Sequence, residues 1–327
     1  MTSTEQTLRI GWMSHHVEGM KPLLDLLAAG IPIAGIITLE PDLLAKRSGA
    51  AAYEEIAALH GLALHRIRNV NNPDSLALLE RLHLDVLFVI GWSQILRKDA
   101  LSLVKVGCFG AHASLLPANR GSAPINWALI KGEKQTGNTL IKLSVEVDGG
   151  DIVAQRAFDI TPFDNVATLY DKVGRSNSEM LLELAQELVS GQPVQSTPQV
   201  DDGSPPLPRR RPEHGQIDWH QPATAVYDFI RALTRPYPGA FSFIAGKRYF
   251  VWRSALLPMD AALAPAGTIL GPVVSDDDTG CGIAVACQRG AIVLHEIERD
   301  DGTQFTGQSL ATEGLSGKWS EGEPCLD

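Results

Sequence analysis

Asp85-Val-Leu-Phe-Val-Ile-Gly91 is the most strand-like stretch of the chain, because an unbroken apolar run lies between an acidic residue and a glycine. Similar short apolar stretches occur before and after it, with helical patterns between them. They are Leu8–Met13, Ile31–Thr38, Val106–Ala111 and Asn138–Leu143. Apolar strands separated by helices indicate a mostly parallel sheet covered on both faces. We therefore predict a doubly wound α/β domain, whose ligand site lies where loops leave the C-terminal ends of the strands.

Helical patterns with recognisable ends separate these strands. Lys21–Ala29 is followed by Gly30, a typical stop signal, and an Ala-rich helix is expected over Ala51–Leu59. Ile152–Ile160 is expected to add another strand, and Ala167–Val189 a long helix that packs onto the sheet. These elements complete the predicted first domain.

The character of the sequence changes at Ser190–Arg211, which is rich in Pro, Ser and Gly and has no apolar period, as is typical of a linker. Beyond it, Ala223–Leu233 is expected to be helical. Short β-like pieces punctuated by Gly and Pro then predict a small antiparallel barrel. These pieces are Phe241–Ile244, Tyr249–Trp252, Gly282–Ala286 and Ala291–Glu296. The expected organisation is a first domain over residues 1–189, a linker over 190–208 and a second domain over 209–327.

Composition narrows the class of protein. The 327 residues are 44% hydrophobic, with no apolar run of transmembrane length and no secretory signal, so we expect a cytoplasmic enzyme. The formal charge of −10 disfavours a role dominated by binding nucleic-acid backbone. No CxxC or zinc-type Cys/His spacing is present, so no metal is expected. The chain also lacks the GxGxxG and GxxxxGK[ST] motifs, which argues against an NAD enzyme or an NTPase.

His112 is the first candidate for chemistry. It follows a predicted strand within Gly107–Gly132, a segment that then opens a helix, so it should lie at the C-terminal edge of the sheet. Imidazole titrates near neutrality and suits a general acid or base if it faces a cleft. A structural histidine is the alternative. Pro117 and Pro124 stiffen the loop, which would hold a catalytic group in place.

Glu146-Val-Asp148-Gly-Gly-Asp151 is the second candidate. Carboxylates around Gly-Gly could bind a cation or form a tight turn, and the small number of oxygen ligands favours the turn. A carboxylate here could instead orient His112 and stabilise its imidazolium. Sequence separation cannot establish that contact.

Two weaker signals accompany these candidates. Ser14-His15-His16 follows the first strand, at the expected edge of the site, but paired histidines without a third ligand are more often solvated loop residues than a metal site. Ser114 lies two residues after His112 and lacks the G-x-S-x-G context of an activated serine.

The segment from His112 to Pro124, HASLLPANRGSAP, resembles the 10-formyltetrahydrofolate-dependent formyltransferases, whose HxSLLPxxRGxxP pattern is long and specific. Asp148-Gly-Gly-Asp-Ile152 is similar to the family's D-x-G-x-I element. Further similarity at Ile217-Asp-Trp219 and Pro236-Tyr-Pro-Gly-Ala240 extends the resemblance over most of the chain. It implies a Rossmann-like formyl-transfer domain followed by an OB-like barrel.

The resemblance also implies roles for individual residues. An Asn-x-His pair and a distant Asp do the chemistry in the family: His acts as acid and base, Asp orients it, and Asn stabilises the oxyanion. His112 and Asp148 match these positions, but Gly110 stands where the Asn is expected. Another donor would then substitute, such as the His112 imidazolium, a backbone N–H or Asn126, or the activity would be weak.

The implied co-substrate is N10-formyltetrahydrofolate, with no metal. The resemblance places it, with the pterin close to the loop that follows the Asp85 strand, near Gly91, Trp92, Ser93, Gln94, Ile95, Leu96 and Asp151. The acceptor amine would meet residues of the first loop and of the loop after His112. These are His15, His16, Ser114, Leu115, Leu116, Pro117, Arg120, Gly121 and Asn126.

Three functions remain open. Similarity at Gly91-Trp-Ser93 and Pro124-Ile-Asn-Trp-Ala128 favours formylation of a small amine, such as a nucleotide-linked amino sugar. Formylation of methionyl-tRNA is opposed by the 11 Lys/Arg against 15 Asp/Glu from Pro205 onward, a net of −4. The third is a folate- or nucleotide-binding homologue with impaired catalysis. A homo-oligomer is left open by the sequence.

Overall fold

The computed structural model describes residues 8–47, 49–200 and 203–320. Contacts divide these residues into two compact units. The first holds residues within 8–124, 135–159 and 170–208, and the second those within 125–134, 160–169 and 209–320. The described residues of 190–208, the stretch that the sequence indicates as a linker, therefore belong to the first unit.

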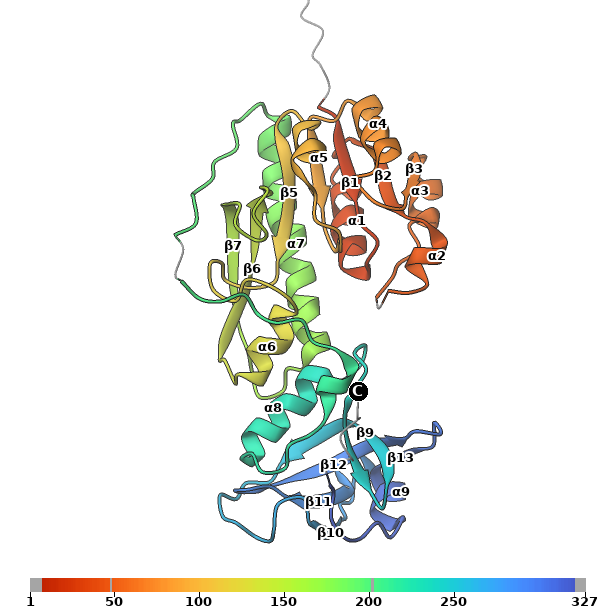
Figure 1. Cartoon of the computed structure of the whole chain (residues 1–327), viewed down its shortest axis with the longest axis vertical. Helices are drawn as coiled ribbons and strands as arrows, with labels where there is room; N and C mark the ends of the chain where they lie inside the picture. Colours follow the sequence, from red (N-terminus) through yellow and green to blue (C-terminus); the bar gives the residue numbers. More distant parts are fainter. Residues whose placement is uncertain (1–7, 48, 201–202, 321–327) are drawn as a thin grey trace, which may run out of the picture. The chain divides into compact units, whose positions relative to one another are not determined.

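A seven-stranded sheet, in the order β3-β2-β1-β4-β5-β6-β7, is the frame of the first unit (Figure 1). The five strands from β3 to β5 are parallel, and β6 and β7 run antiparallel to their neighbours. The prediction of a mostly parallel sheet is confirmed. The strands are β1 Ile10–Met13, β2 Ile33–Leu39, β3 Leu64–Ile67, β4 Val86–Val89, β5 Gly107–His112, β6 Gln135–Lys142 and β7 Asp151–Asp159.

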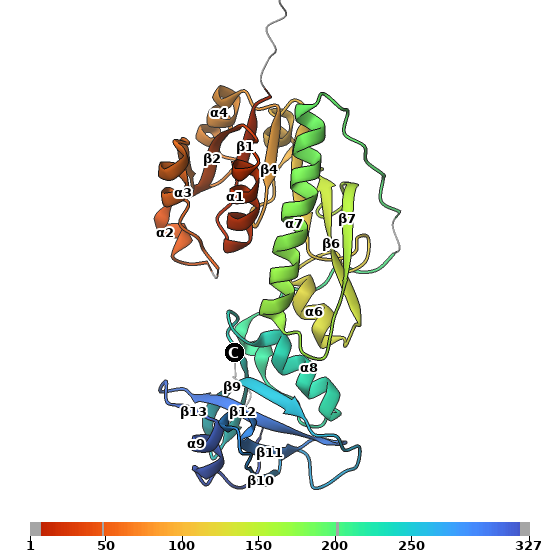
Figure 2. The same cartoon turned by 180° about the vertical axis from the view of Figure 1, so that it is seen from behind.

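Helices cover both faces of this sheet, as predicted. Figure 2 shows α1 and α7 over one face, where Leu23 and Leu181 pack on strand residues such as Phe88. Leu79 of α4 and Ala100 of α5 belong to a second core on the other face. The helices are α1 Met20–Ala28, α2 Pro41–Leu44, α3 Glu54–His60, α4 Pro73–Leu82, α5 Lys98–Ser102, α6 Pro124–Ile130 and α7 Val166–Val189.

Local sequence signals predicted the end of helix α1 but not the presence of strand β3. Helix α1 stops as expected at Gly30, which has φ +74°, and the N–H of Ile31 donates to Leu26 O at 3.0 Å. Strand β3 was not anticipated, because its sequence LHRI contains no continuous apolar run. It forms because it pairs with β2 at the sheet edge, where exposure tolerates polar side chains.

An antiparallel sheet organises the second unit, with strands in the order β10-β11-β12-β9-β8 and β13 paired to β12. Its separate antiparallel character is confirmed, and its closure into an OB-like barrel stays a prediction. The elements are α8 Ala223–Leu233, β8 Ala240–Ile244, β9 Lys247–Leu256, β10 Ile269–Val273, β11 Gly282–Ala286, β12 Ala291–Arg299, β13 Gln304–Thr306 and α9 Gly307–Thr312. Among the described residues, no helix combines the length and apolarity that crossing a membrane requires.

Candidate active site

The loop that carries the site begins at the C-terminal end of β5. His112 is the last residue of this strand, and it pairs in register with Thr139 of β6. The Thr139 hydroxyl donates to Ser114 O at 2.6 Å and accepts from Leu116 N at 3.1 Å. This buried hydroxyl therefore folds the loop back over the strand and sets where the residues after His112 lie.

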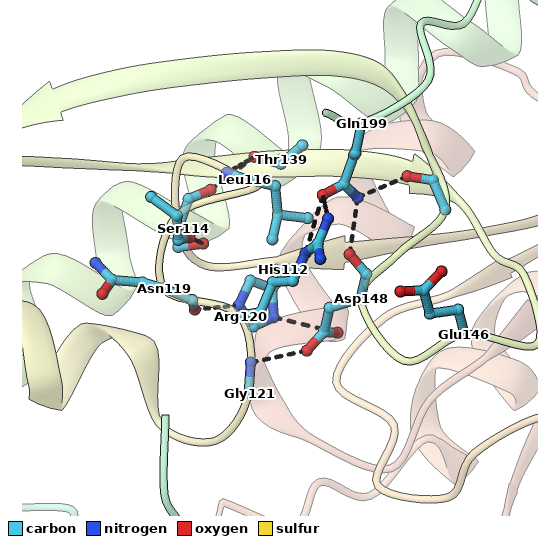
Figure 3. A network of polar contacts seen from close by, with 12 residues as sticks. His112, Ser114, Leu116, Asn119, Arg120, Gly121, Thr139, Glu146, Asp148 and Gln199 are labelled. Atoms are coloured by element: carbon cyan, nitrogen blue, oxygen red, sulfur yellow. Dashed lines mark hydrogen bonds and ion pairs between the residues drawn. The ribbon is translucent and has the colours of Figure 1, made fainter. Parts of the chain in front are cut away.

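Both ring nitrogens of His112 face acceptors (Figure 3). Nδ1 lies 3.5 Å from Asp148 Oδ1, and Nε2 lies 2.9 Å from the carbonyl oxygen of Asn119. A neutral imidazole has a single N–H and can donate to only one of these oxygens. The doubly protonated ring can donate to both, so the two oxygens can stabilise the charge that the ring gains when it takes up a proton.

Asp148 comes from the turn between β6 and β7. Its Oδ2 accepts from Gly121 N at 3.0 Å, so one carboxylate contacts both the histidine and the loop that follows it. The Glu146–Asp151 stretch forms the tight turn that the sequence favours, with Gly149 N donating to Glu146 O at 3.3 Å. The turn therefore presents the carboxylate to His112, the contact that sequence separation could not establish.

Gly110 lies two residues before His112 on the same strand. A Cβ built on it would meet Leu143 Cδ2 at 2.9 Å and Val89 O at 3.2 Å. The space for a side chain at this position is thus filled by Leu143, an apolar residue that immediately follows β6. Asn126, considered as a substitute donor, lies in the second unit, where its buried amide donates to Ala232 O at 2.7 Å.

The loop after β4, residues 91–96, is held by a side chain from within it. Gln94 accepts from Val70 N at 2.8 Å and donates to Arg68 O at 2.8 Å, so its amide serves the loop's own structure. Ile95 is 59% exposed, and Trp92 Nε1 is buried without a partner among the described residues. Gly91 has φ +59°, and a Cβ there would lie 2.7 Å from that of His16.

The first loop differs from the expectation of solvated histidines. The His15 ring is 4% exposed, packs 5.4 Å from the Trp92 ring and contacts Ser93 Oγ through Nε2 at 3.0 Å. This burial lowers the pKa of His15 to about 4. The half-buried His16 accepts from Glu18 N through Nδ1, and burial lowers its pKa too. The His15 ring therefore joins the first loop to the 91–96 loop, whereas the His16 ring accepts a hydrogen bond within the first loop.

Several other predicted site residues pack against, or hydrogen-bond to, other parts of the protein. Ser114 is buried and donates to Ala118 O at 2.7 Å, and the Leu116–Pro117 peptide is cis. Leu115 lies over Gly137, where a Cβ would approach its side chain to 2.3 Å. Asp151 accepts from Ser196 Oγ at 3.4 Å, at the far side of the turn.

Two polar contacts were not anticipated from the sequence. Gln199 contacts both the Arg120 side chain and the backbone of the Asp148 turn, although it lies in the Pro-rich stretch predicted as a linker. Glu18 accepts from Asn177 Nδ2 at 3.1 Å, and burial raises its pKa. No local signal marks either contact, because each joins segments far apart in the chain.

The site and fold together define a class: an α/β enzyme with a His–carboxylate pair at the C-terminal edge of its sheet, followed by an antiparallel β unit. The family model described as "Formyl transferase" matches residues 33–185, and "Formyl transferase, C-terminal domain" matches residues 210–313. These matches cover most of the chain. The chain therefore belongs to the formyltransferase family.

Solved structures share this fold. HypX from Aquifex aeolicus, in complex with tetrahydrofolic acid, is 19% identical with a TM-score of 0.63 over 96% of this chain and 48% of that one. This chain thus spans about half the length of HypX. WlaRD, a sugar 3N-formyltransferase, and an N-formyltransferase from Helicobacter canadensis are each 15% identical with a TM-score of 0.63. Both matches cover 88% of this chain, and 97% and 98% of those chains.

Proposed function

We propose that this protein transfers the formyl group of N10-formyltetrahydrofolate to the primary amine of a small molecule, specifically a nucleotide-linked amino sugar. The observation that carries the proposal is the His112–Asp148 pair: Nδ1 of His112, the first residue of the HASLLPANRGSAP motif, lies 3.5 Å from Oδ1 of Asp148. The pair supplies an acid and base for amine acylation without a metal or a covalent enzyme intermediate.

Asp148 assigns the two nitrogens of His112 different tasks. The carboxylate faces Nδ1 and stabilises the positive charge of the ring when it carries both protons. Nε2 is then the nitrogen that exchanges a proton with the substrate, in place of its hydrogen bond to Asn119 O. The bound folate supplies the formyl carbon that the amine attacks, and the proton lost by the amine passes through Nε2 to the departing folate nitrogen.

The loop 91–96 offers features that suit a pterin. Exposed Ile95 provides an apolar contact, and Trp92 brings a ring and a buried N–H donor that has no partner within the described chain. Gln94 fixes the loop before any ligand binds, which lowers the entropy cost of binding. WlaRD in the presence of dTDP and 5-N-formyl-THF, and the Helicobacter canadensis enzyme with folinic acid and dTDP-3-aminofucose, support this class of ligand pair.

Methionyl-tRNA is a less suitable acceptor. Phosphate contacts supply most of the affinity for tRNA, and the sequence from Pro205 onward carries a net charge of −4. A folate-binding homologue with impaired catalysis is the second candidate. It is favoured by one observation: Leu143 fills the position of the family's oxyanion donor at Gly110.

The test is turnover of N10-formyltetrahydrofolate with a panel of amino-sugar nucleotides, N-hydroxyornithine and methionyl-tRNA, read by mass spectrometry as the gain of one formyl group. Formylation of an amino-sugar nucleotide is the expected result. Selective formylation of methionyl-tRNA would replace the proposal with the tRNA function. Folate binding without transfer to any acceptor would favour the impaired homologue.

A further inference from the structure

Gln199 bridges the two backbone segments that carry His112 and Asp148 (Figure 3). Its Oε1 accepts from Arg120 Nε at 3.3 Å and from Nη2 at 3.0 Å. Its Nε2 donates to the carbonyl oxygens of Asp148 and Gly150, each at 2.7 Å. A single side-chain amide therefore joins the loop after β5 to the turn before β7.

The turn has a conformation that needs support. Asp148 has φ +54°, a left-handed conformation that costs a non-glycine residue about 1 kcal/mol. Next to it, a Cβ on Gly150 would lie 1.9 Å from Lys142 O, so this backbone packs closely against the end of β6. The two bonds from Gln199 hold the carbonyls on either side of Gly149, and thereby the direction in which the Asp148 carboxylate points.

The segment around Gln199 is itself anchored. Thr197 exchanges two backbone hydrogen bonds of 2.8 Å with Ile152 on the edge strand β7. Further along, Leu207 N donates to Arg120 O at 2.7 Å and Leu207 O accepts from Ser122 N at 3.1 Å. Gln199 is half-buried, whereas both of its chain neighbours are exposed. The described residues on both sides of 201–202 are thus hydrogen-bonded to the first unit, at the edge strand and at the loop after β5, and Gln199 directs its polar side chain inward.

We propose that Gln199 is a positioning residue for the His112–Asp148 pair. The inference rests on the proposed function, in which that pair exchanges the proton of the amine. Gln199 acts through the Asp148 backbone and the Arg120 guanidinium, both of which it contacts directly. Loss of its amide displaces the carboxylate relative to the ring, and a displacement of about 1 Å in such a site lowers the rate by about 100-fold.

The experiment compares Gln199→Ala and Gln199→Glu with Gln195→Ala as the matched control. Gln195 lies on the same segment, is exposed, and its amide contacts only Pro193 O among the described residues. Glu at 199 still accepts from Arg120 but cannot donate to the two carbonyls. The readouts are kcat, folate affinity, thermal unfolding, and the ring signals of His112 in ¹⁵N-histidine-labelled protein, assigned by their loss in His112→Ala.

Both Gln199 variants are expected to shift the His112 ring signals and to lower kcat about 10- to 100-fold, with folate affinity within about twofold of wild type. The Gln195 variant is expected to match wild type in every readout. Unchanged His112 signals in Gln199→Ala would overturn the inference. So would parallel losses of kcat, folate affinity and thermal stability, which indicate a structural role alone.

The ring signals do not depend on turnover. If no acceptor of the panel is formylated and the His112 signals still shift in both Gln199 variants, the proposed function fails and the positioning role stands. If an acceptor is formylated and the signals do not shift, the reverse holds.

Discussion

Leu143 occupies the space that a side chain on Gly110 would need. Its Cδ2 lies 2.9 Å and its Cδ1 3.4 Å from a Cβ built on that glycine. The two residues lie on neighbouring antiparallel segments, and Leu143 N donates to Cys108 O at 2.8 Å, which fixes their register. Gly110 stands where the family has an Asn, and the apolar side chain of Leu143 therefore fills the space that the Asn side chain would occupy.

This relationship predicts how the two positions couple. Gly110→Asn alone is expected to destabilise the fold by about 1–3 kcal/mol, because the new side chain overpacks against Leu143. Adding Leu143→Ala to it should recover about 1–2 kcal/mol relative to the sum of the single variants. Urea unfolding of the four proteins in the cycle measures this coupling, and strict additivity would contradict it.

The same double variant tests the second candidate function. If the protein is an impaired homologue, the double variant provides an Asn side chain at position 110 and the space for it. The rate of formyl transfer would then rise by about 100- to 1000-fold, the usual contribution of one oxyanion donor. Under the proposed function another donor, such as a backbone N–H or the His112 imidazolium, takes the place of the Asn, and we expect a gain well below that range. The rate of formyl transfer by Gly110→Asn/Leu143→Ala, relative to Leu143→Ala, decides between them.

The acid–base pair gives a kinetic prediction. His112→Ala is expected to lower kcat by about 100- to 10,000-fold with little change in folate affinity, because the ring acts in proton transfer. Asp148→Asn keeps an acceptor for Gly121 N–H and removes the charge beside the ring, so its effect should also fall on kcat. Asp159→Asn, at the other end of β7, is the matched control and should resemble wild type. Equal losses in kcat and folate affinity would instead indicate a structural role for the pair.

Gln94 gives a prediction for binding. Gln94→Ala removes two hydrogen bonds that hold the 91–96 loop against residues 68–70. Each such bond contributes about 0.5–1.5 kcal/mol to the stability of the loop conformation. In the variant the loop is ordered only when folate binds, and this cost weakens the binding. Folate affinity is expected to fall about tenfold, measured by fluorescence titration. Gln135→Ala, on an exposed end of β6, should leave it unchanged. A Gln94 variant with wild-type affinity would argue against this loop as the folate site.

The buried His15 predicts a pH dependence of stability. Its pKa is near 4 in the folded protein and near its ordinary 6.5 when unfolded. Between these values the unfolded chain binds more protons, so the free energy of unfolding falls as the pH falls from 6.5 toward 4. The contribution of His15 is about 1–3 kcal/mol. His15→Gln should reduce the loss of urea-unfolding stability between pH 7 and pH 5. Part of that loss should remain, because burial also lowers the pKa of the half-buried His16. Identical slopes for both proteins would contradict this assignment.

The sequence predicted the first unit well where local patterns are strong. Apolar runs correctly located β1, β2, β4 and β5, and Gly30 correctly ended α1. The mostly parallel sheet followed from their alternation with helices. The family was identified from the HASLLPANRGSAP motif, which is contiguous and so survives in one dimension. The β-like pieces of the second unit were also located, although not how they pair.

Tertiary structure alone decided how the site is assembled. Asp148 reaches His112, Leu143 fills the position at Gly110, and Gln199 joins Arg120 across 79 residues of chain. Each contact depends on strand register and on hydrogen bonds between distant segments, for which composition and periodicity carry no signal. The Pro-rich stretch Ser190–Arg211 has no apolar period, so its sequence resembles a linker. In the structure, however, its Thr197 and Leu207 form backbone hydrogen bonds with Ile152 and Arg120. The sequence therefore determined which chemistry this protein carries, and the fold decided which residues hold it in place.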